Sequence, residues 1–149
     1  MLDSDNMFVI FRARQGEPIL SAGPLGLFTA RPDALWKDKI LVSGDGSPVR
    51  SYLDQDDLAA WLTSLLTGGQ PGEAYNLGSD EPISIRDLAH LVRDLIAPGK
   101  QVEVLKASYG TAARQYYVPD ISKITKALGV RKTVSLKDSI VKTAEANRV

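Results

Sequence analysis

The side chains that could take part in acid–base or metal chemistry are few. Asp54, Asp56 and Asp57 form a cluster of carboxylates, and His90 is the one histidine of the 149 residues. A Ca²⁺ loop needs oxygen ligands spaced regularly over about twelve residues, so loop and helix-cap roles are favoured for the cluster. His90 lies in a helical pattern away from its apolar face, with no neighbour that could orient it as a general base. We therefore predict no catalytic residue among these groups.

Composition excludes several further classes of protein. The chain has no cysteine, so disulfides and thiolate chemistry are excluded, and one imidazole does not make a zinc site. The 18 basic residues balance 18 acidic ones, and those after residue 100 lack the interleaved aromatic residues of a single-strand binder. No apolar run approaches the roughly 20 residues of a membrane span, and the N-terminus lacks a signal pattern. We expect a cytoplasmic protein with no metal, nucleic-acid or membrane partner.

Arg50 and Asn76 are polar residues at positions where a ligand could bind. Arg50 lies between residues 42 and 99, a stretch with nine acidic and three basic residues, so a solvated basic face does not explain it. It alternates with its neighbours in a predicted strand, and its guanidinium could donate two parallel hydrogen bonds to phosphate oxygens. Asn76 ends another short predicted strand, before a turn at Gly78. The ordinary alternative is a surface Arg and an Asn that closes a turn.

Alternating strand and helix patterns predict the elements that position these residues. Strands are expected at residues 40–42, 49–53, 74–78 and 101–105. Asp45 and Gly46 predict a β-hairpin between the first two strands. Helices are expected to begin at Asp57 and Ser84, each acting as an N-cap, and at residues 121 and 135. The pattern is typical of an α+β fold, a small mixed domain of short strands and about four helices.

Six weak motifs follow one another in an order and spacing that together are specific. They lie at residues 40–53, 57–59, 72–79, 83–89, 117–120 and 128–138. In this order they resemble the C-terminal, substrate-binding part of the NAD-dependent nucleotide-sugar epimerase/dehydratase family, the extended short-chain dehydrogenases. The resemblance covers residues 42–149 and implies the fold of that family's substrate-binding cap.

The catalytic half of that family is not recognisable in this sequence. In the family, an N-terminal Rossmann half supplies a glycine-rich pyrophosphate loop and a catalytic Tyr-x-x-x-Lys. The glycines at 23 and 26 lack the G-x-G-x-x-G spacing, and none of the five tyrosines has a lysine four residues later. The resemblance therefore implies NAD(P) only for the missing Rossmann half. We expect no cofactor and no catalytic residue in this chain.

The resemblance also implies substrate-binding residues. The family uses an Arg and an Asn near the substrate diphosphate, at the positions of Arg50 and Asn76. Arg114 is a further candidate for contact with the diphosphate or the nucleobase, although it is offset from the family's position immediately before Tyr117. Asp54 stands where the family has an aromatic residue or His, which is a departure in the sugar pocket. The implied ligand is a nucleoside diphosphate sugar.

Two domains are predicted, residues 1–41 as an N-terminal segment and 42–149 as a nucleotide-sugar-binding-like domain. Deleting residues 21–41 joins 16–20 to 42–46 in the family's register, which indicates an insertion. The alternative is that unrelated sequence precedes a truncated domain. Both interpretations remain open.

Three functions also remain open. The chain is a truncated or stand-alone substrate-binding domain without activity of its own, one chain of a split enzyme with a separate Rossmann chain, or a structural or interaction protein. Because the family's cap packs against its Rossmann half, the exposed interface predicts a homo-oligomer.

Overall fold

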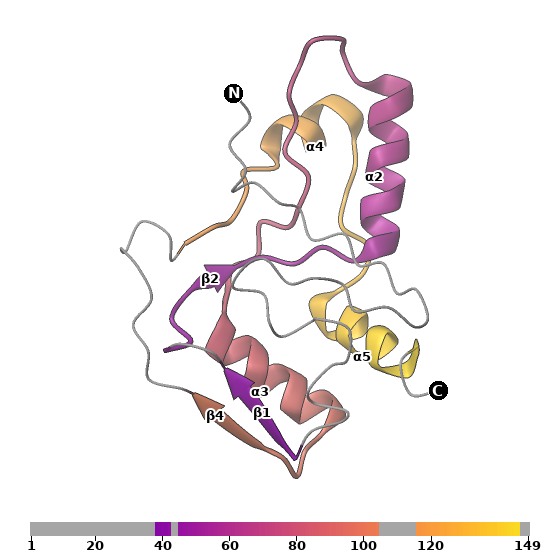
Figure 1. The fold of residues 1–149 in the computed structure, drawn as a ribbon. Helices are drawn as coiled ribbons and strands as arrows, with labels where there is room; N and C mark the ends of the chain where they lie inside the picture. Colours follow the sequence, from indigo (N-terminus) through magenta and orange to yellow (C-terminus); the bar gives the residue numbers. More distant parts are fainter. Residues whose placement is uncertain (1–37, 43–44, 105–115, 147–149) are drawn as a thin grey trace, which may run out of the picture.

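The computed structural model describes residues 38–42, 45–104 and 116–146, and within them it has the predicted α+β fold (Figure 1). Four helices and four short strands occur in these ranges. Their order is β1 (Lys39–Val42), β2 (Val49–Arg50), α2 (Gln55–Gly68), β3 (Ile83–Ser84), α3 (Ile85–Ile96), β4 (Gln101–Val104), α4 (Ser122–Leu128) and α5 (Leu136–Ala146). The described helices do not include one with the length and apolar character that a membrane span requires.

The predicted domain boundary after residue 41 falls inside β1, which runs from Lys39 to Val42. Most of the segment 21–41 lies outside the described residues, as do residues 1–20. The division into 1–41 and 42–149, with an insertion at 21–41, therefore stays a prediction.

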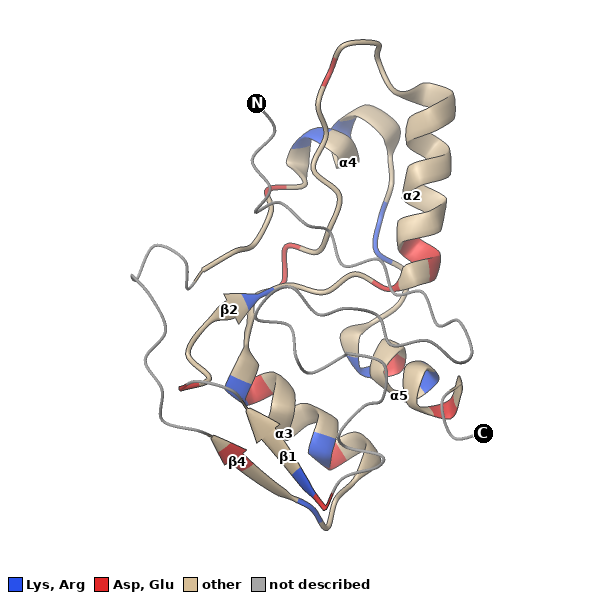
Figure 2. Ribbon diagram, viewed as in Figure 1, with Lys and Arg blue, Asp and Glu red and all other residues tan. Residues whose placement is uncertain are grey.

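Helix α2 begins earlier than predicted, because its N-cap is Asp54 and not Asp57. The Asp54 carboxylate accepts a hydrogen bond of 2.9 Å from the backbone N–H of Asp56. The acidic side chains gathered at the start of α2 are visible in Figure 2. Asp57 lies inside the first turn. Its carboxylate accepts hydrogen bonds from the backbone N–H groups of Thr133 and Val134, which are distant in the sequence. Because the Asp57 carboxylate binds these distant groups, it does not cap the helix, and the N-cap predicted from the local pattern was wrong.

The predicted hairpin is wrong, because β1 and β2 belong to different two-stranded sheets. β1 pairs in parallel with β4, and β2 pairs antiparallel with β3. The turn at Gly46, with a φ of 71°, brings the chain to the start of α3 instead. There the carbonyls of Gly46 and Pro48 accept hydrogen bonds from the N–H groups of Arg86 and Ile85. These bonds to a distant helix replace the expected pairing of neighbouring strands.

The predicted strand at 74–78 is also wrong, because no strand forms there. Contacts from the region of α4 hold this segment in place. Lys123 Nζ donates to the carbonyl of Ala74 at 2.7 Å and forms an ion pair with Glu73 at the same distance. The Lys123 ammonium also lies 4.9 Å from the centre of the Tyr75 ring, a cation–π contact. Side chains therefore fix a segment that has no partner strand.

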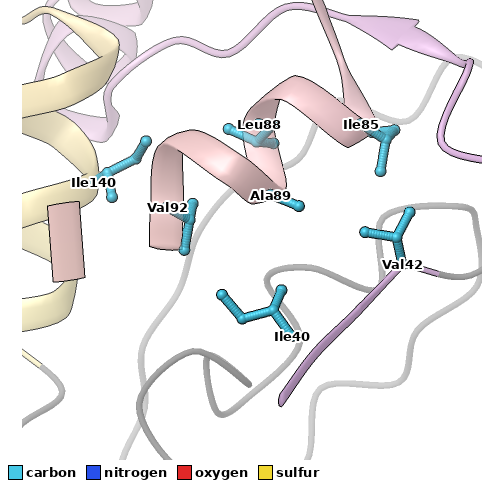
Figure 3. Close-up of a cluster of buried hydrophobic side chains, with 7 residues drawn as sticks. All are labelled: Ile40, Val42, Ile85, Leu88, Ala89, Val92 and Ile140. Atoms are coloured by element: carbon cyan, nitrogen blue, oxygen red, sulfur yellow. The ribbon is translucent and has the colours of Figure 1, made fainter. Parts of the chain in front are cut away.

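The buried apolar residues form two separate clusters. The first cluster comprises Ile40, Val42, Ile85, Leu88, Ala89, Val92 and Ile140, from β1, α3 and α5 (Figure 3). The second cluster comprises Trp61, Leu77, Ile124 and Val130, from α2, α4 and the segments beside them. The buried residues of α3 and α5 lie on one face of each helix, and α4 ends at a left-handed Gly129 with a φ of 67°. β2, with which β3 pairs, lies between the pair α2 and α4 and the pair α3 and α5 (Figure 1).

Replacing Ser84 with alanine is expected to destabilise the chain by about 1 kcal/mol, because Ser84 is the N-cap of α3. Its Oγ accepts a bond of 3.0 Å from the N–H of Asp87 and donates one of 2.6 Å to the Asp87 carboxylate. Urea unfolding measures the change. Ser84→Asn keeps a capping oxygen and should retain most of the stability. Equal losses in the two variants would show that the cap is not what matters at this position.

Candidate functional site

Arg50 lies at the end of β2, where it is half-buried. Its Nη1 donates a hydrogen bond of 2.7 Å to the carbonyl of Val49, which orients the guanidinium. β3 borders β2 on one side. On the other side, Val49 forms a parallel bridge with Tyr116, and the N–H of Tyr117 donates to the Val49 carbonyl at 3.0 Å. Arg50 is therefore held on a narrow ribbon made by three segments that are distant in sequence.

Two exposed tyrosines lie beside Arg50. Side chains alternate along extended chain, and residues paired across a ladder project from the same face. Because Val49 pairs with Tyr116, the next residues on each segment, Arg50 and Tyr117, share the opposite face. Tyr117 is 47% exposed and Tyr116 is 61% exposed. Tyr117 was not among the candidates from the sequence, although its place in the Tyr-x-x-Asp motif could have indicated it.

Tyr52 lies close enough to Arg50 for the guanidinium to affect the ionisation of the phenol. Burial raises the pKa of the Tyr52 hydroxyl to about 12, and the Arg50 guanidinium opposes this shift only in part. The phenol is therefore protonated at neutral pH, which makes it unsuitable as a general base. Tyr52 also packs against the first cluster. The observed geometry gives it a packing role beside the candidate site.

Asn76 is exposed and lies next to the same distant segment that borders β2. Its Nδ2 donates a hydrogen bond of 3.0 Å to the carbonyl of Asp120. A Cβ added at Gly78 would lie 2.6 Å from Cγ of Pro119, so the two segments are in close contact there as well. Asp120 Oδ1 accepts a bond of 2.8 Å from the N–H of Ser122 at the start of α4. Asn76 thus joins the segment 74–79 to residues 116–120.

The segment 116–120 links the strand of Arg50 to the side chain of Asn76. Its first two residues contact the strand of Arg50, and its last residue accepts the hydrogen bond from Asn76. Five extended residues reach at most about 17 Å, which limits the distance between the backbone contact at Val49 and the hydrogen bond at Asn76. Figure 2 shows blue, the colour of Lys and Arg, at the end of β2, between the acidic start of α2 and the segment that leads to α4. Arg114, the third candidate, lies outside the described residues.

The carboxylate cluster has a structural role. Asp57 is 3% exposed and accepts bonds from the N–H of Thr133 at 2.9 Å, the Thr133 hydroxyl at 2.5 Å and the N–H of Val134 at 3.0 Å. Lys142 Nζ lies 2.9 Å from Asp54 Oδ1 and 2.6 Å from Asp56 Oδ2. Within the described residues, no group of three or more His, Cys, Asp or Glu side chains could hold a metal ion. The cluster therefore matches the loop and cap roles favoured by the sequence.

The two buried carboxylates predict loss of stability in acid. Burial alone would raise the pKa of Asp57 and of Asp54, but the hydrogen bonds that each accepts, with Lys142 also acting on Asp54, outweigh burial and lower both pKa values. A carboxyl whose pKa is lower in the folded state stabilises the fold above its unfolded pKa, and this contribution is lost as the pH falls through the folded value. Urea midpoints should be constant from pH 7 to pH 5 and decline from near pH 4 downward. A midpoint that is unchanged at pH 2.5 would contradict the prediction.

Comparison with known proteins identifies relatives that share this part of the fold. No family model matches the chain. It is 35% identical over 109 residues to a putative GDP-L-fucose synthase of Arabidopsis thaliana, covering 72% of this chain and 32% of the relative. It is 30% identical over 107 residues to a dTDP-glucose 4,6-dehydratase of Streptomyces antibioticus, again covering 72% and 32%. The chain thus spans about a third of the length of these curated relatives, each 32% covered.

A solved structure shows the same relation. The dTDP-glucose 4,6-dehydratase of Streptomyces venezuelae, crystallised with NAD bound, is 28% identical and superposes with a TM-score of 0.67. The match covers 78% of this chain and 36% of the dehydratase. The described fold is therefore one part of a larger architecture in that protein.

Proposed function

Because the chain belongs to the NAD-dependent epimerase/dehydratase family, we propose that it binds the nucleoside diphosphate portion of a nucleotide sugar. The supporting observation is that residues 116–120 connect the strand of Arg50 to the side chain of Asn76. The names of the relatives include GDP-, dTDP- and UDP-linked sugars, whose shared chemical group is a nucleoside diphosphate. The diphosphate is therefore the part of the ligand that this site would recognise in common.

Arg50 is the proposed anchor of the diphosphate. A guanidinium has five N–H donors in a fixed planar arrangement, so the bond to the Val49 carbonyl is compatible with two further bonds to phosphate oxygens. Its partial burial beside Tyr52 strengthens such bonds, because charges interact more strongly where water is excluded. Arg50 would therefore supply most of the electrostatic attraction for the ligand.

Asn76, Tyr117 and Arg114 are the proposed secondary contacts. Asn76 gives one amide N–H to Asp120, and a primary amide has a second N–H and an oxygen that can meet a ligand. Tyr117 projects from the face of Arg50 and offers an exposed ring for stacking and a hydroxyl for hydrogen bonding. Arg114 precedes this tyrosine by three residues in the sequence. These groups would determine where the nucleoside lies relative to the diphosphate.

We infer that the described residues do not hold the dinucleotide cofactor. A dinucleotide pyrophosphate binds at a helix N-terminus that is free of negative charge, where backbone N–H groups point toward it. The first turn of α2 carries Asp56 and Asp57, that of α3 carries Asp87 and that of α5 carries Asp138. The first turn of α4 has no acidic residue, but the carboxylate of Asp120 accepts a hydrogen bond from the N–H of Ser122 at its start. These carboxylates would repel a pyrophosphate. We propose that NAD(P) binding and redox chemistry belong to a Rossmann half, either elsewhere in the same protein or in a separate chain.

Isothermal titration calorimetry of the purified chain tests this proposal. UDP, dTDP, CDP and GDP are titrated in turn, with NAD and inorganic phosphate as controls, and turnover is assayed on matching nucleotide sugars. We expect at least one nucleoside diphosphate to bind weakly, with a Kd of roughly 0.1 to 1 mM, because only one wall of the site is present. We expect neither NAD binding nor turnover. Micromolar affinity for NAD, or no binding of any nucleoside diphosphate, would refute the proposal.

A second candidate function is a homo-oligomeric interaction protein. The outer face of α2 favours it, since Leu66 is 88% exposed and Leu62 is 40% exposed, and no charged residue follows Asp57 in this helix. Exposed apolar faces of this kind are typical of contact surfaces. Light scattering at high micromolar concentration should then show a dimer that Leu66→Lys disrupts, with Ala127→Lys on α4 as a matched control. A monomeric wild-type chain would exclude this function.

A further inference from the structure

The two apolar clusters are packed within themselves and joined mainly by connecting segments. Helix α3 packs against α5, β1, β3 and β4, while α2 packs against α4. In the part of the chain that the structure describes, no helix or strand of the first group packs extensively on α2 or α4. The described segments that pass between the groups are residues 51–54, 78–82, 116–121 and 129–135 (Figure 1). The relative orientation of the groups must therefore depend on what joins these segments.

Polar side chains connect the two groups, in addition to the backbone contact of Val49 with residues 116 and 117. Lys142, on α5 of the first group, bridges Asp54 and Asp56 at the start of α2. Asp57, in the first turn of α2, holds the N–H groups of Thr133 and Val134 in the segment that leads to α5. Two of the three carboxylates, those of Asp54 and Asp57, are buried. Buried charged groups with several partners fix geometry more strictly than apolar contacts, which tolerate sliding.

The two halves of the proposed binding site lie on different groups. Arg50 is on β2, which pairs with β3, and Ile83 of β3 packs against the first cluster. Asn76 precedes Leu77, which is buried in the second cluster, and it is bonded to residues that lead into α4. A change in the angle between the groups would therefore change the distance between Arg50 and Asn76 within the reach that residues 116–120 allow.

We propose that Lys142 is a positioning residue that fixes the angle between the two groups and so sets the spacing of Arg50 and Asn76 for a nucleoside diphosphate. This inference rests on the proposed function for its effect on binding. Its structural part, that Lys142 holds α2 against α5, stands on the two ion pairs and the burial of Asp54. Lys142 does not touch the proposed ligand. It acts through the start of α2.

The test compares three variants of the whole 149-residue chain. Lys142→Met removes the ammonium and keeps the length of the side chain, Lys142→Arg keeps a positive group that can bridge two carboxylates, and Lys137→Met is the control at an exposed lysine of the same helix. Residual dipolar couplings report the angle between α2 and α3. Calorimetry reports the Kd for the nucleoside diphosphate that the wild type binds best, and amide exchange reports the integrity of each cluster.

We expect Lys142→Met to weaken nucleotide binding about tenfold, because Arg50 and Asn76 would no longer be positioned to contact the ligand at the same time. The dipolar couplings of α2 and α3 should no longer fit one common orientation, while slow amide exchange persists within each cluster. Lys142→Arg should restore both measurements, and Lys137→Met should match the wild type.

Two results would overturn the inference. One is a wild-type α2–α3 orientation in Lys142→Met, whatever happens to the affinity. The other is an affinity that is unchanged although the orientation is lost. If the wild type binds no nucleoside diphosphate, the proposed function fails, and the dipolar couplings alone still confirm or refute the role of Lys142 in fixing the angle.

Discussion

Replacing Asp57 with alanine is expected to lower the free energy of unfolding by about 3 to 5 kcal/mol. The substitution leaves the N–H groups of Thr133 and Val134 and the Thr133 hydroxyl without their acceptor in a site where the carboxylate is almost fully buried. Each hydrogen bond to a charged group contributes about 1.5 to 3 kcal/mol, and Asp57 accepts three of them. A domain of this size has roughly 5 to 15 kcal/mol in total, so the variant should retain only part of its stability.

Thermal unfolding followed by circular dichroism measures this effect. A loss of about 3 kcal/mol should lower the Tm by roughly 10 °C in a chain of this length. Asp94→Ala is the matched control, because Asp94 is exposed and its ion pair is with the neighbouring Arg93. The control should unfold within about 2 °C of the wild type. If both variants unfold at the same temperature, the carboxylate of Asp57 does not connect α2 to residues 133 and 134 in solution.

Replacing Arg50 with lysine is expected to weaken binding of a nucleoside diphosphate about tenfold or more. The charge is kept, but an ammonium cannot donate two parallel bonds in one plane to phosphate oxygens. Charge-assisted paired bonds are about twice as strong as neutral ones, so their loss should dominate the affinity. Lysine also loses the bond that orients the guanidinium on the Val49 carbonyl.

Asn76→Ala is the matched comparison for Arg50→Lys. It removes one neutral hydrogen-bonding group and should cost on the order of 1 kcal/mol of binding free energy, about fivefold in Kd. Calorimetry on both variants shows which substitution raises the Kd more, and amide exchange confirms that each variant is folded. If Arg50→Lys binds with the wild-type affinity, Arg50 does not anchor the diphosphate, and the oligomeric function is favoured.

The features that could be predicted from the sequence are those that depend on local interactions. The start of helix α3 and its cap at Ser84 could be predicted, because the cap and the helix that it begins are neighbours in sequence. The end of α4 at Gly129 was predictable for the same reason, since a left-handed residue after a helix favours glycine.

The features that were missed depend on partners distant in sequence. The hairpin prediction failed because β1 pairs with β4, and the cap of α2 was misplaced because residues 133 and 134 bind Asp57. At the candidate site, a resemblance to a known family indicated Arg50 and Asn76, but no local pattern could show that residues 116–120 lie between them. That Tyr117 lies beside Arg50 also depends on the pairing of two segments that are distant in sequence.

Backbone NMR of the wild-type chain, titrated with UDP, dTDP, CDP and GDP, tests the central claim most directly. If the site is where Arg50 and Asn76 place it, at least one nucleoside diphosphate will shift the amide signals of Arg50, Asn76 and Tyr117 together, with one common Kd. Inorganic phosphate at the same concentration should leave Asn76 unchanged. Shifts confined to other parts of the chain, or no shifts with any of the four nucleotides, would contradict the account.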